Sequence, residues 1–287
     1  MRNRPGPQLE LVERRPSKPV LQAPVLLVHG AYAGAWCWEE YFLPYFAERG
    51  VHAYALSLRG HGRSEGRQQL PMTALADYVE DIEQVVAQLP QTPVLVGHSM
   101  GGMVVQKYLE RHDDVPGVVL IASVPPQGLC LPALQLLLND PWLFWQVSLM
   151  QYTSPSHASF ESDRPLVFSD ALSDADRQRF RRRFGPESAR AMWDMTLSDL
   201  VCPWRIKKPP MLVLGGGSDV LFTEKMVRST ASAYGVQAEI FPDMAHLVML
   251  EPGWQQVADR IIDWLIALEG GKPPSSKTAG ARRRARP

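Results

Sequence analysis

The chain lacks the features that mark several large classes of protein. Only three cysteines occur in 287 residues, Cys37, Cys130 and Cys202, and they form no CxxC pair. Their number and spacing favour a reducing compartment and predict neither a disulfide framework nor a zinc site. The sequence shows no cluster of metal ligands and no GxGxxG after a strand, so we expect neither a metal nor a nucleotide cofactor.

Long hydrophobic runs and a net charge of one sign are missing as well. The most apolar window, 131–150, is broken at Asn139, Asp140 and Pro141 into pieces too short to span a bilayer. No apolar segment of the secretory signal type opens the chain. Lys+Arg and Asp+Glu balance at 30 each, which predicts no nucleic-acid partner. We expect a soluble, cytoplasmic protein without stable membrane insertion, and the sequence leaves its oligomeric state open.

The charge is uneven along the chain. The stretch 272–287, "KPPSSKTAGARRRARP", carries six basic residues and no acid, which leaves 24 basic against 30 acidic residues elsewhere. We interpret 270–287 as a disordered basic tail. At the other end, 1–22 is predicted to be an extension in which "LELVERR" forms a short antiparallel edge strand.

What the sequence does contain is a regular alternation of strands and helices. Near-continuous apolar runs that end in glycine or polar turns predict strands within 24–30, 51–60, 92–99, 115–123, 209–219 and 238–246. Amphipathic patterns predict helices at 36–49, 74–89, 100–111, 223–234 and 253–268. This alternation is typical of an α/β fold with a mostly parallel, doubly wound sheet covered on both faces.

The alternation stops between 125 and 205. This segment has apolar helical pieces and several prolines but no convincing strand. We predict a helical cap over the carboxyl ends of the strands, inserted into a core made of 23–124 and 206–269. A pair of ordinary peripheral helices is the alternative.

A serine between two glycines lies where the third predicted strand meets a helix, in "VLVGHSMGG" (94–102). By chance alone, G-x-S-x-G would occur in roughly one chain of this size in ten, so its setting matters more than its presence. A strand before it and a helical pattern after it place Ser99 on a strained elbow with an exposed hydroxyl. Gly97 and Gly101 are predicted to be necessary because side chains there would collide with neighbouring backbone.

Ser99 needs a general base, and His246 is best placed to be one. It follows the last predicted strand, on a loop that in a doubly wound sheet lies at the same edge as the elbow. Side chains diverge at a sharp turn, so we predict a structural role for His98. His29 and His61 lie in glycine-flanked loops, which predicts loop-fixing hydrogen bonds. The remaining histidines have surface or cap contexts: His52, His112 and His157.

The base in turn needs an acid that holds its tautomer. Asp219 ends the strand "MLVLGGGSD" at the carboxyl edge of the sheet. Asp243 competes, because it lies three residues before His246, but it is better explained as a turn residue after Pro242. The strand ending "LIAS" offers Ser123 and no acid. We therefore predict Asp219, which yields the chain order Ser…Asp…His expected for this architecture.

A tetrahedral intermediate also needs hydrogen-bond donors for its oxyanion, each typically contributing about 3 kcal/mol. The backbone N–H of Met100, directly after the nucleophile, is one candidate. The second is expected from "HGAYAGAW" (29–36), where Gly30 lets the loop turn and Ala31 or Tyr32 presents its N–H. Tyr32 is alternatively a plain wall of the pocket.

Five ordered segments resemble the α/β-hydrolase superfamily across about 20–269. They are "HGAYAGAWCW", "LRGHGRSEG", "GHSMGG", "GGGSDVLF" and "DMAHLVMLEP". The first is similar to the loop of plant methylesterases and hydroxynitrile lyases. The second and third are more similar to bacterial carboxylesterases and monoacylglycerol lipases. The resemblance implies a catalytic triad and an oxyanion hole at Ser99, Asp219, His246, Met100 and Ala31 or Tyr32.

Departures from the wider superfamily narrow the chemistry. The lyases carry a threonine where Gly30 stands and a lysine where Leu247 follows the histidine, so cyanide handling is unsupported. Dehalogenases and epoxide hydrolases use an aspartate nucleophile, and Ser99 speaks against both. Cofactor-free dioxygenases of this fold remain an alternative.

We therefore expect a serine hydrolase that cleaves a carboxylic ester of a lipophilic small molecule through an acyl-enzyme. Apolar and aromatic residues in and near the predicted cap suggest a lipophilic pocket, although packing of the cap on the core explains part of them. Thioesters, lactones and carbon–carbon bonds are alternative substrates of the same machinery, and a non-catalytic ligand-binding protein is a remote one. The predicted substrate-binding residues are Trp36, Leu134, Trp142, Trp145 and Leu247.

Overall fold

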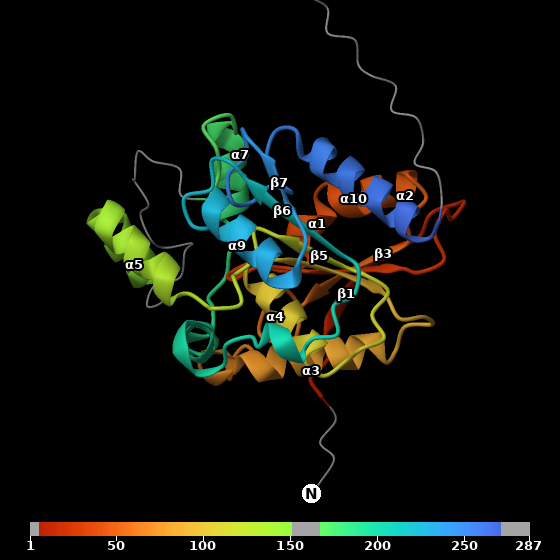
Figure 1. Ribbon diagram of the computed structural model, residues 1–287, viewed down its shortest axis with the longest axis horizontal. Coiled ribbons are helices and arrows are strands. Elements are labelled where there is room, and N and C mark those ends of the chain that lie inside the picture. Colours follow the sequence, from red (N-terminus) through yellow and green to blue (C-terminus); the bar gives the residue numbers. More distant parts are fainter. Residues whose placement is uncertain (1–5, 151–166, 271–287) are drawn as a thin grey trace, which may run out of the picture.

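The computed structural model describes residues 6–150 and 167–270, and seven of their strands form one sheet (Figure 1). The strand order is β1-β3-β2-β4-β5-β6-β7, with β1 antiparallel to β3 and every other pair parallel. The strands are β1 Glu10–Arg14, β2 Val25–Val28, β3 Ala53–Ser57, β4 Val94–His98, β5 Val118–Ile121, β6 Met211–Gly216 and β7 Ala238–Phe241. The predicted parallel sheet and its antiparallel edge strand are confirmed.

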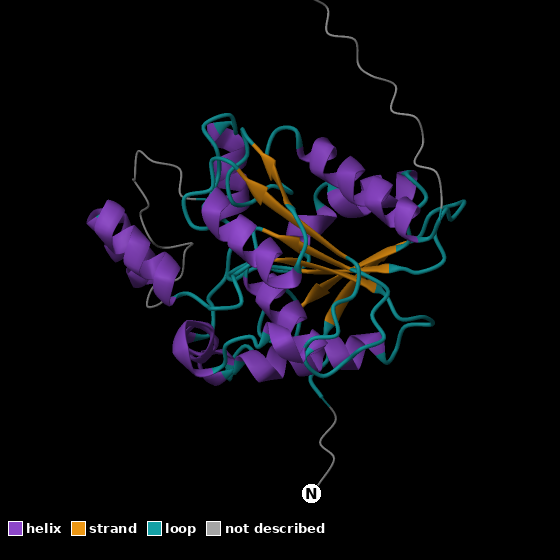
Figure 2. Ribbon diagram, viewed as in Figure 1, coloured by secondary structure: helices purple, strands orange, loops and turns teal. Residues whose placement is uncertain are grey.

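Helices cover both faces of this sheet (Figure 2). The longer ones are α3 Leu75–Val86, α4 Met100–Leu109, α5 Cys130–Asn139, α6 Pro141–Met150, α9 Glu224–Tyr234 and α10 Trp254–Leu268. The shorter ones are α1 Trp36–Glu39, α2 Phe42–Glu48, α7 Asp174–Arg181 and α8 Ala189–Trp193, with η1 Leu70–Met72, η2 Asp194–Ser198 and η3 Pro203–Arg205. No helix among the described residues has the length and apolar character needed to cross a membrane.

Alternate residues of each parallel strand enter two separate cores. In β2, Val25 and Leu27 pack in the core with α1, α2 and α10, whereas Leu26 and Val28 pack in the core with α3, α4 and α9. Figure 1 shows α2 and α10 on one side of the sheet and α3 and α4 on the other. Burial on both faces explains why these strands read as continuous apolar runs in the sequence.

The topology brings the candidate residues to one edge. The strand order reverses at β2, because β2 pairs with β3 on one side and with β4 on the other. Loops that follow the carboxyl ends of parallel strands meet at the same edge, and ligands bind where the strand order reverses. His29 follows β2, Ser99 follows β4 and Asp219 follows β6 at this edge.

One predicted helix is divided in two. The pattern over 36–49 predicts a single helix, but the structure ends α1 at Glu39 and begins α2 at Phe42. Pro44 explains the break: it has no N–H to donate, and its ring would collide with the carbonyl of residue 40 in a continuous helix.

The segment 125–205 is helical where the structure describes it. Helices α5 and α6 precede residues 151–166, and α7, α8, η2 and η3 follow them. Helix α5 projects from the body at the left of Figure 1. The expected tail 270–287 lies outside the described residues except for Gly270, as does the predicted cap histidine His157.

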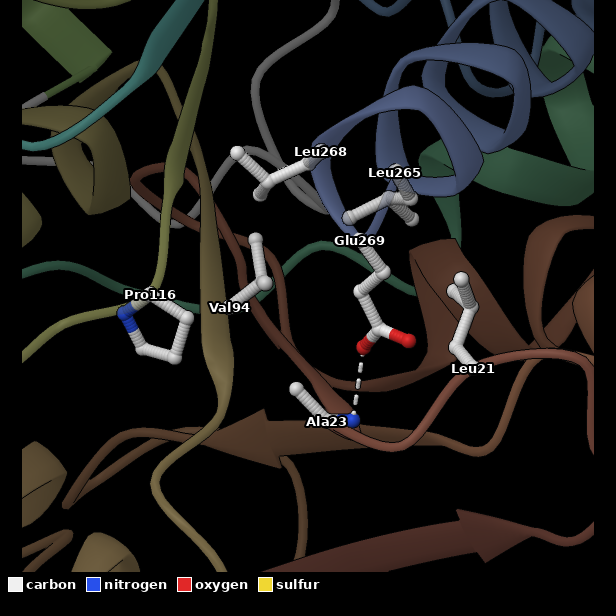
Figure 3. A pocket seen from close by; sticks show the side chains of 7 residues that line it. All are labelled: Leu21, Ala23, Val94, Pro116, Leu265, Leu268 and Glu269. Atoms are coloured by element: carbon white, nitrogen blue, oxygen red, sulfur yellow. Dashed lines mark hydrogen bonds between the residues drawn. The ribbon is translucent and has the colours of Figure 1, made fainter. Parts of the chain in front are cut away.

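An apolar cavity of about 150 Å³ lies at the opposite edge of the sheet. Figure 3 shows its lining, in which Val94 begins β4, the strand whose far end leads to Ser99. The Glu269 carboxylate crosses it to accept the N–H groups of Gln22 and Ala23. These bonds fasten the end of α10 to the loop before β2. The cavity therefore lies where the end of α10 is attached to the loop before β2, remote from the candidate site.

Candidate active site

Ser99 occupies a strained turn between β4 and α4. Its φ is 52° and its ψ is −118°, in the left-handed half of backbone space that side chains rarely adopt. The Ser99 N–H donates to the Ile121 carbonyl at 3.1 Å, and its own carbonyl accepts from Val124 at 3.1 Å and Gly102 at 3.0 Å. Several neighbours thus impose the strained conformation, which is the situation expected of a functional turn.

The two glycines of the motif are required by close backbone contacts. A Cβ on Gly97 would come within 2.6 Å of the Gly101 carbonyl oxygen and of Gly102 Cα. A Cβ on Gly101 would come within 2.4 Å of the His29 carbonyl oxygen and 2.6 Å of that of Val28. The predicted collisions with helix and strand are both confirmed.

Asp219 and His246 form the hydrogen-bonded pair that the sequence predicts. His246 Nδ1 lies 2.8 Å from Asp219 Oδ2, and both side chains are buried. The other carboxylate oxygen of Asp219 accepts the N–H groups of Leu221 at 2.8 Å and Phe222 at 3.0 Å, which fixes its orientation. Asp243, the competing acid, is exposed.

Glycines allow the two loops that carry this pair to approach each other. A Cβ on Gly216 would come within 2.3 Å of the Met244 carbonyl oxygen, and one on Gly217 within 2.6 Å of that of Pro242. The Ser218 N–H donates to Met244 at 2.9 Å. The glycines before Asp219 thus allow the loop after β6 to pack closely against the loop after β7.

His98 connects the elbow to the histidine loop. Its Nε2 donates to the His246 carbonyl at 3.0 Å, and the two rings lie 4.7 Å apart between centroids. Burial, together with the nearby His246, holds the pKa of His98 well below its usual value, so the ring is neutral. The predicted structural role of His98 is confirmed, and it places Ser99, the next residue, in the neighbourhood of His246.

The loop after β2 lies against the elbow, since a Cβ on Gly30 would come within 2.9 Å of Ser99 Cβ. The buried His29 ring fastens this loop: Nδ1 donates to the Gly30 carbonyl at 2.8 Å and Nε2 accepts from the Leu58 N–H at 3.0 Å. Burial lowers the pKa of His29 to about 3, so the neutral ring holds this tautomer. The predicted loop-fixing bonds of His29 are confirmed.

The prediction that Tyr32 could donate its N–H to an oxyanion needs correction. Its N–H donates to Glu187 Oε2 at 3.1 Å, its carbonyl accepts from Gly185 at 2.8 Å, and its φ is 64°. An N–H bound to a carboxylate is not free for an oxyanion. Within the described part of the chain the Ala31 N–H has no acceptor. Of the two predicted residues of this loop, Ala31 therefore keeps a free N–H, and its role as an oxyanion donor stays a prediction.

Glu187 is the site residue that the sequence did not reveal. Its carboxylate is 1% exposed and accepts from four groups: the Tyr32 N–H at 3.1 Å, His61 Nε2 at 3.0 Å, the Tyr78 hydroxyl at 2.7 Å and the Ser188 N–H at 2.7 Å. Burial alone would raise its pKa, but His61 and these hydrogen bonds lower it to about 2. No motif marks a glutamate in this segment.

A model described as the alpha/beta hydrolase family matches residues 25–260 of this sequence. The chain belongs to the alpha/beta hydrolase family. The match spans the Ser99 turn, Asp219 and His246.

Relatives of this hydrolase include a monoacylglycerol lipase of Mycolicibacterium smegmatis, 26% identical over 85% of this chain and 88% of that protein. Methylesterase 2 of Arabidopsis thaliana is 34% identical over 31% of this chain and 34% of its own length. Among solved structures, an esterase from Thermogutta terrifontis has a TM-score of 0.67 at 19% identity and covers 91% of this chain and 94% of its own. This similarity shows that the two proteins share a fold.

The predicted substrate-binding residues of the hydrolase fall into two groups. Trp36 packs in the core, stacked on Phe180 of α7, and Leu247 is buried in the same core. Leu134, Trp142 and Trp145 are exposed on α5 and α6, at 50%, 72% and 60%. The two groups thus differ in their surroundings, and their roles in binding stay predictions.

The structure assigns His61 to the Glu187 pair, and the ring nitrogens of His52 and His112 lie beside Glu13 and Glu83. Among the described residues, no group of three or more His, Cys, Asp or Glu is placed to hold a metal ion.

Proposed function

We propose that this protein is a serine hydrolase that cleaves a carboxylic ester of a lipophilic small molecule through an acyl-enzyme. The observation that carries the proposal is the Asp219–His246 pair, bonded at 2.8 Å at the sheet edge where Ser99 occupies its strained elbow. A serine on such a turn and an oriented base at the same edge of the sheet are what nucleophilic catalysis needs.

In the first half-reaction His246 Nε2 takes the proton of Ser99 as Oγ attacks the ester carbonyl, and the resulting imidazolium is stabilised by Asp219. The developing oxyanion is bound by the N–H groups of Met100 and Ala31. The imidazolium then protonates the leaving alkoxide. In the second half-reaction a water attacks the acyl-enzyme by the same route and releases the acid.

The substrate class rests on two further observations. Relatives named monoacylglycerol lipase and methylesterase support ester hydrolysis. The exposed apolar side chains of α5 and α6, Leu138 and Trp142 at 72% and Trp145 at 60%, support a lipophilic substrate, because large exposed apolar side chains commonly mark binding surfaces.

The proposal is tested with p-nitrophenyl esters from acetate to palmitate. We expect the native chain to turn over with a rate that peaks at one acyl length. Ser99→Ala removes the nucleophile and should lower kcat about 10³-fold or more. Asp219→Asn should lower it by about 10² to 10⁴-fold, because the His246 tautomer is no longer held.

Asp243→Asn is the matched control, since Asp243 precedes His246 on the same loop but is exposed. It should leave kcat within a factor of about two, as surface changes generally do. Equal rates in the native chain and Ser99→Ala would reject the proposal and direct the search to thioesters, lactones or a binding role.

A further inference from the structure

A buried ion pair contacts the loop after β2 at Tyr32; residues 29–36 of this loop are called the oxyanion loop below. His61 and Glu187 are each 1% exposed and lie 3.0 Å apart, Nε2 to Oε2. The other ring nitrogen of His61, Nδ1, lies 3.1 Å from the Arg59 carbonyl oxygen. Both ring nitrogens therefore face acceptors. Only the doubly protonated imidazolium can donate to both.

The same carboxylate holds a strained backbone residue. Tyr32 has a φ of 64°, a conformation that costs a residue with a side chain about 1–2 kcal/mol. Its N–H is held by Glu187 and its carbonyl by the Gly185 N–H, so residues 185–187 bind both backbone polar groups of Tyr32. The turn at Tyr32 directly follows Ala31, whose N–H is the candidate oxyanion donor.

A negative charge this close to an oxyanion hole needs compensation. An uncompensated carboxylate would repel the developing oxyanion, most strongly in the low dielectric of a buried site. The His61 imidazolium supplies the opposite charge from the loop after β3, and Tyr78 and Ser188 satisfy the remaining lone pairs.

We propose that Glu187 is a positioning residue for the oxyanion hole, holding the Tyr32 N–H so that Ala31 presents its own N–H to the substrate, with the His61 imidazolium neutralising its charge. This inference rests on the proposed function. Glu187 touches neither the substrate nor the reacting atoms, and acts through the backbone of the loop.

The surroundings of His61 give the arrangement a pH dependence. Burial alone would lower the pKa of His61, but the Glu187 carboxylate raises it above the usual value. The other groups that face the pair are Arg67, which opposes protonation, the neutral His29 ring at 5.0 Å and the Tyr78 ring at 5.8 Å. Loss of the His61 proton at alkaline pH leaves the Glu187 charge uncompensated.

The test compares native chain, Glu187→Ala and Glu187→Gln on the best p-nitrophenyl ester. We expect Glu187→Ala to lower kcat about 10- to 100-fold with KM changed less than threefold, because the lost interaction matters in the transition state. Inhibition by a trifluoromethyl ketone, which forms an oxyanion on Ser99, should weaken by the same factor. Binding of the product acid should not change.

Glu187→Gln keeps an acceptor for Tyr32 without the charge. It should recover part of the lost kcat, and the alkaline fall of activity seen in the native chain should be absent, because a glutamine leaves no negative charge when His61 loses its proton. A merely structural role for Glu187 would move the melting temperature without moving this pH profile or the ketone inhibition.

Asp194→Ala is the matched control. Asp194 is also buried, lies in the same segment and accepts a backbone N–H, from Leu75 at 3.1 Å, but contacts Arg190 and Ser198 instead of the oxyanion loop. It should lower stability and leave kcat within about twofold. A folded Glu187→Ala with native kcat overturns the inference alone. A native chain that neither turns over esters nor reacts with a fluorophosphonate removes the proposed function, and the inference with it.

Discussion

Gly101, in the first turn of α4, shows how single residues support the nucleophile. The Cβ of Gly101→Ala would lie 2.4 Å from the His29 carbonyl oxygen and 2.6 Å from that of Val28, and both are backbone atoms that cannot rotate away. We expect the elbow to shift. Overpacking of this kind costs about 1–3 kcal/mol, and a small displacement at the reacting atoms lowers kcat by up to about 10²-fold. Ester kinetics and thermal melting measure the two effects.

Gly117→Ala is the control at the same scale. Its Cβ would meet the side-chain ends of Leu268 and Trp264 at 2.7 and 2.9 Å, at the start of β5 and far from the elbow. We expect a modest loss of stability and native kcat. If Gly101→Ala behaved in the same way, the close packing of the elbow would be irrelevant to catalysis.

Some residues of the candidate site could be predicted from the sequence around them, and others depend on residues far away in the chain. Ser99, Asp219 and His246 each lie in a loop after a predicted strand. Their position at one edge of the sheet was therefore predictable from the topology. The choice between Ala31 and Tyr32 was not, because it depends on Glu187, 155 residues from Tyr32. Contacts of that separation, made by a carboxylate in a segment without strands, leave no periodic signal in the sequence.

At the scale of elements, the two serine caps of α7 and α8 differ in burial. Ser188 Oγ accepts the Ala191 N–H at 3.0 Å and donates to the Thr73 carbonyl at 2.6 Å, with the residue fully buried. Ser188→Ala loses the cap and leaves a buried carbonyl without its donor, so we expect the free energy of unfolding to fall by about 2–4 kcal/mol. Urea unfolding measures this change.

Ser173→Ala provides the comparison. Its Oγ accepts the Asp176 N–H at 3.1 Å at the exposed start of α7, where water replaces the lost bond. The expected loss is about 1 kcal/mol. Losses of equal size for the two serines would show that burial of the Ser188 cap contributes nothing.

Elements were predictable where one pattern dominates. Strands buried on both faces and helices with one apolar face have clear periods, and the structure contains them. The break between α1 and α2 was hidden because apolar residues continue through it, although Pro44 was visible. The arrangement of α5 and α6 was not predictable, because helices with apolar residues on several sides leave open which side packs on the core.

At the scale of the whole molecule, stability should fall as the pH drops from about 6.5 to 4.5. Burial lowers the pKa of His29 to about 3 and that of His98 well below its usual value, so both are neutral when folded and take up protons on unfolding. An unfolded state that binds more protons makes the free energy of unfolding rise with pH and fall on acidification. Burial raises the pKa of Asp81 to about 6 and also raises that of Glu251, and these groups act in the opposite direction.

His29→Gln tests the contribution of His29 to this pH dependence of stability. Glutamine can accept from Leu58 and donate to Gly30 but does not titrate, so the slope of the unfolding free energy against pH should decrease by up to about 1.4 kcal/mol per pH unit. Urea unfolding at several pH values between 4.5 and 6.5 measures the slope. An unaltered slope in His29→Gln would mean that His29 is protonated in the folded chain, which its bond from the Leu58 N–H to Nε2 forbids.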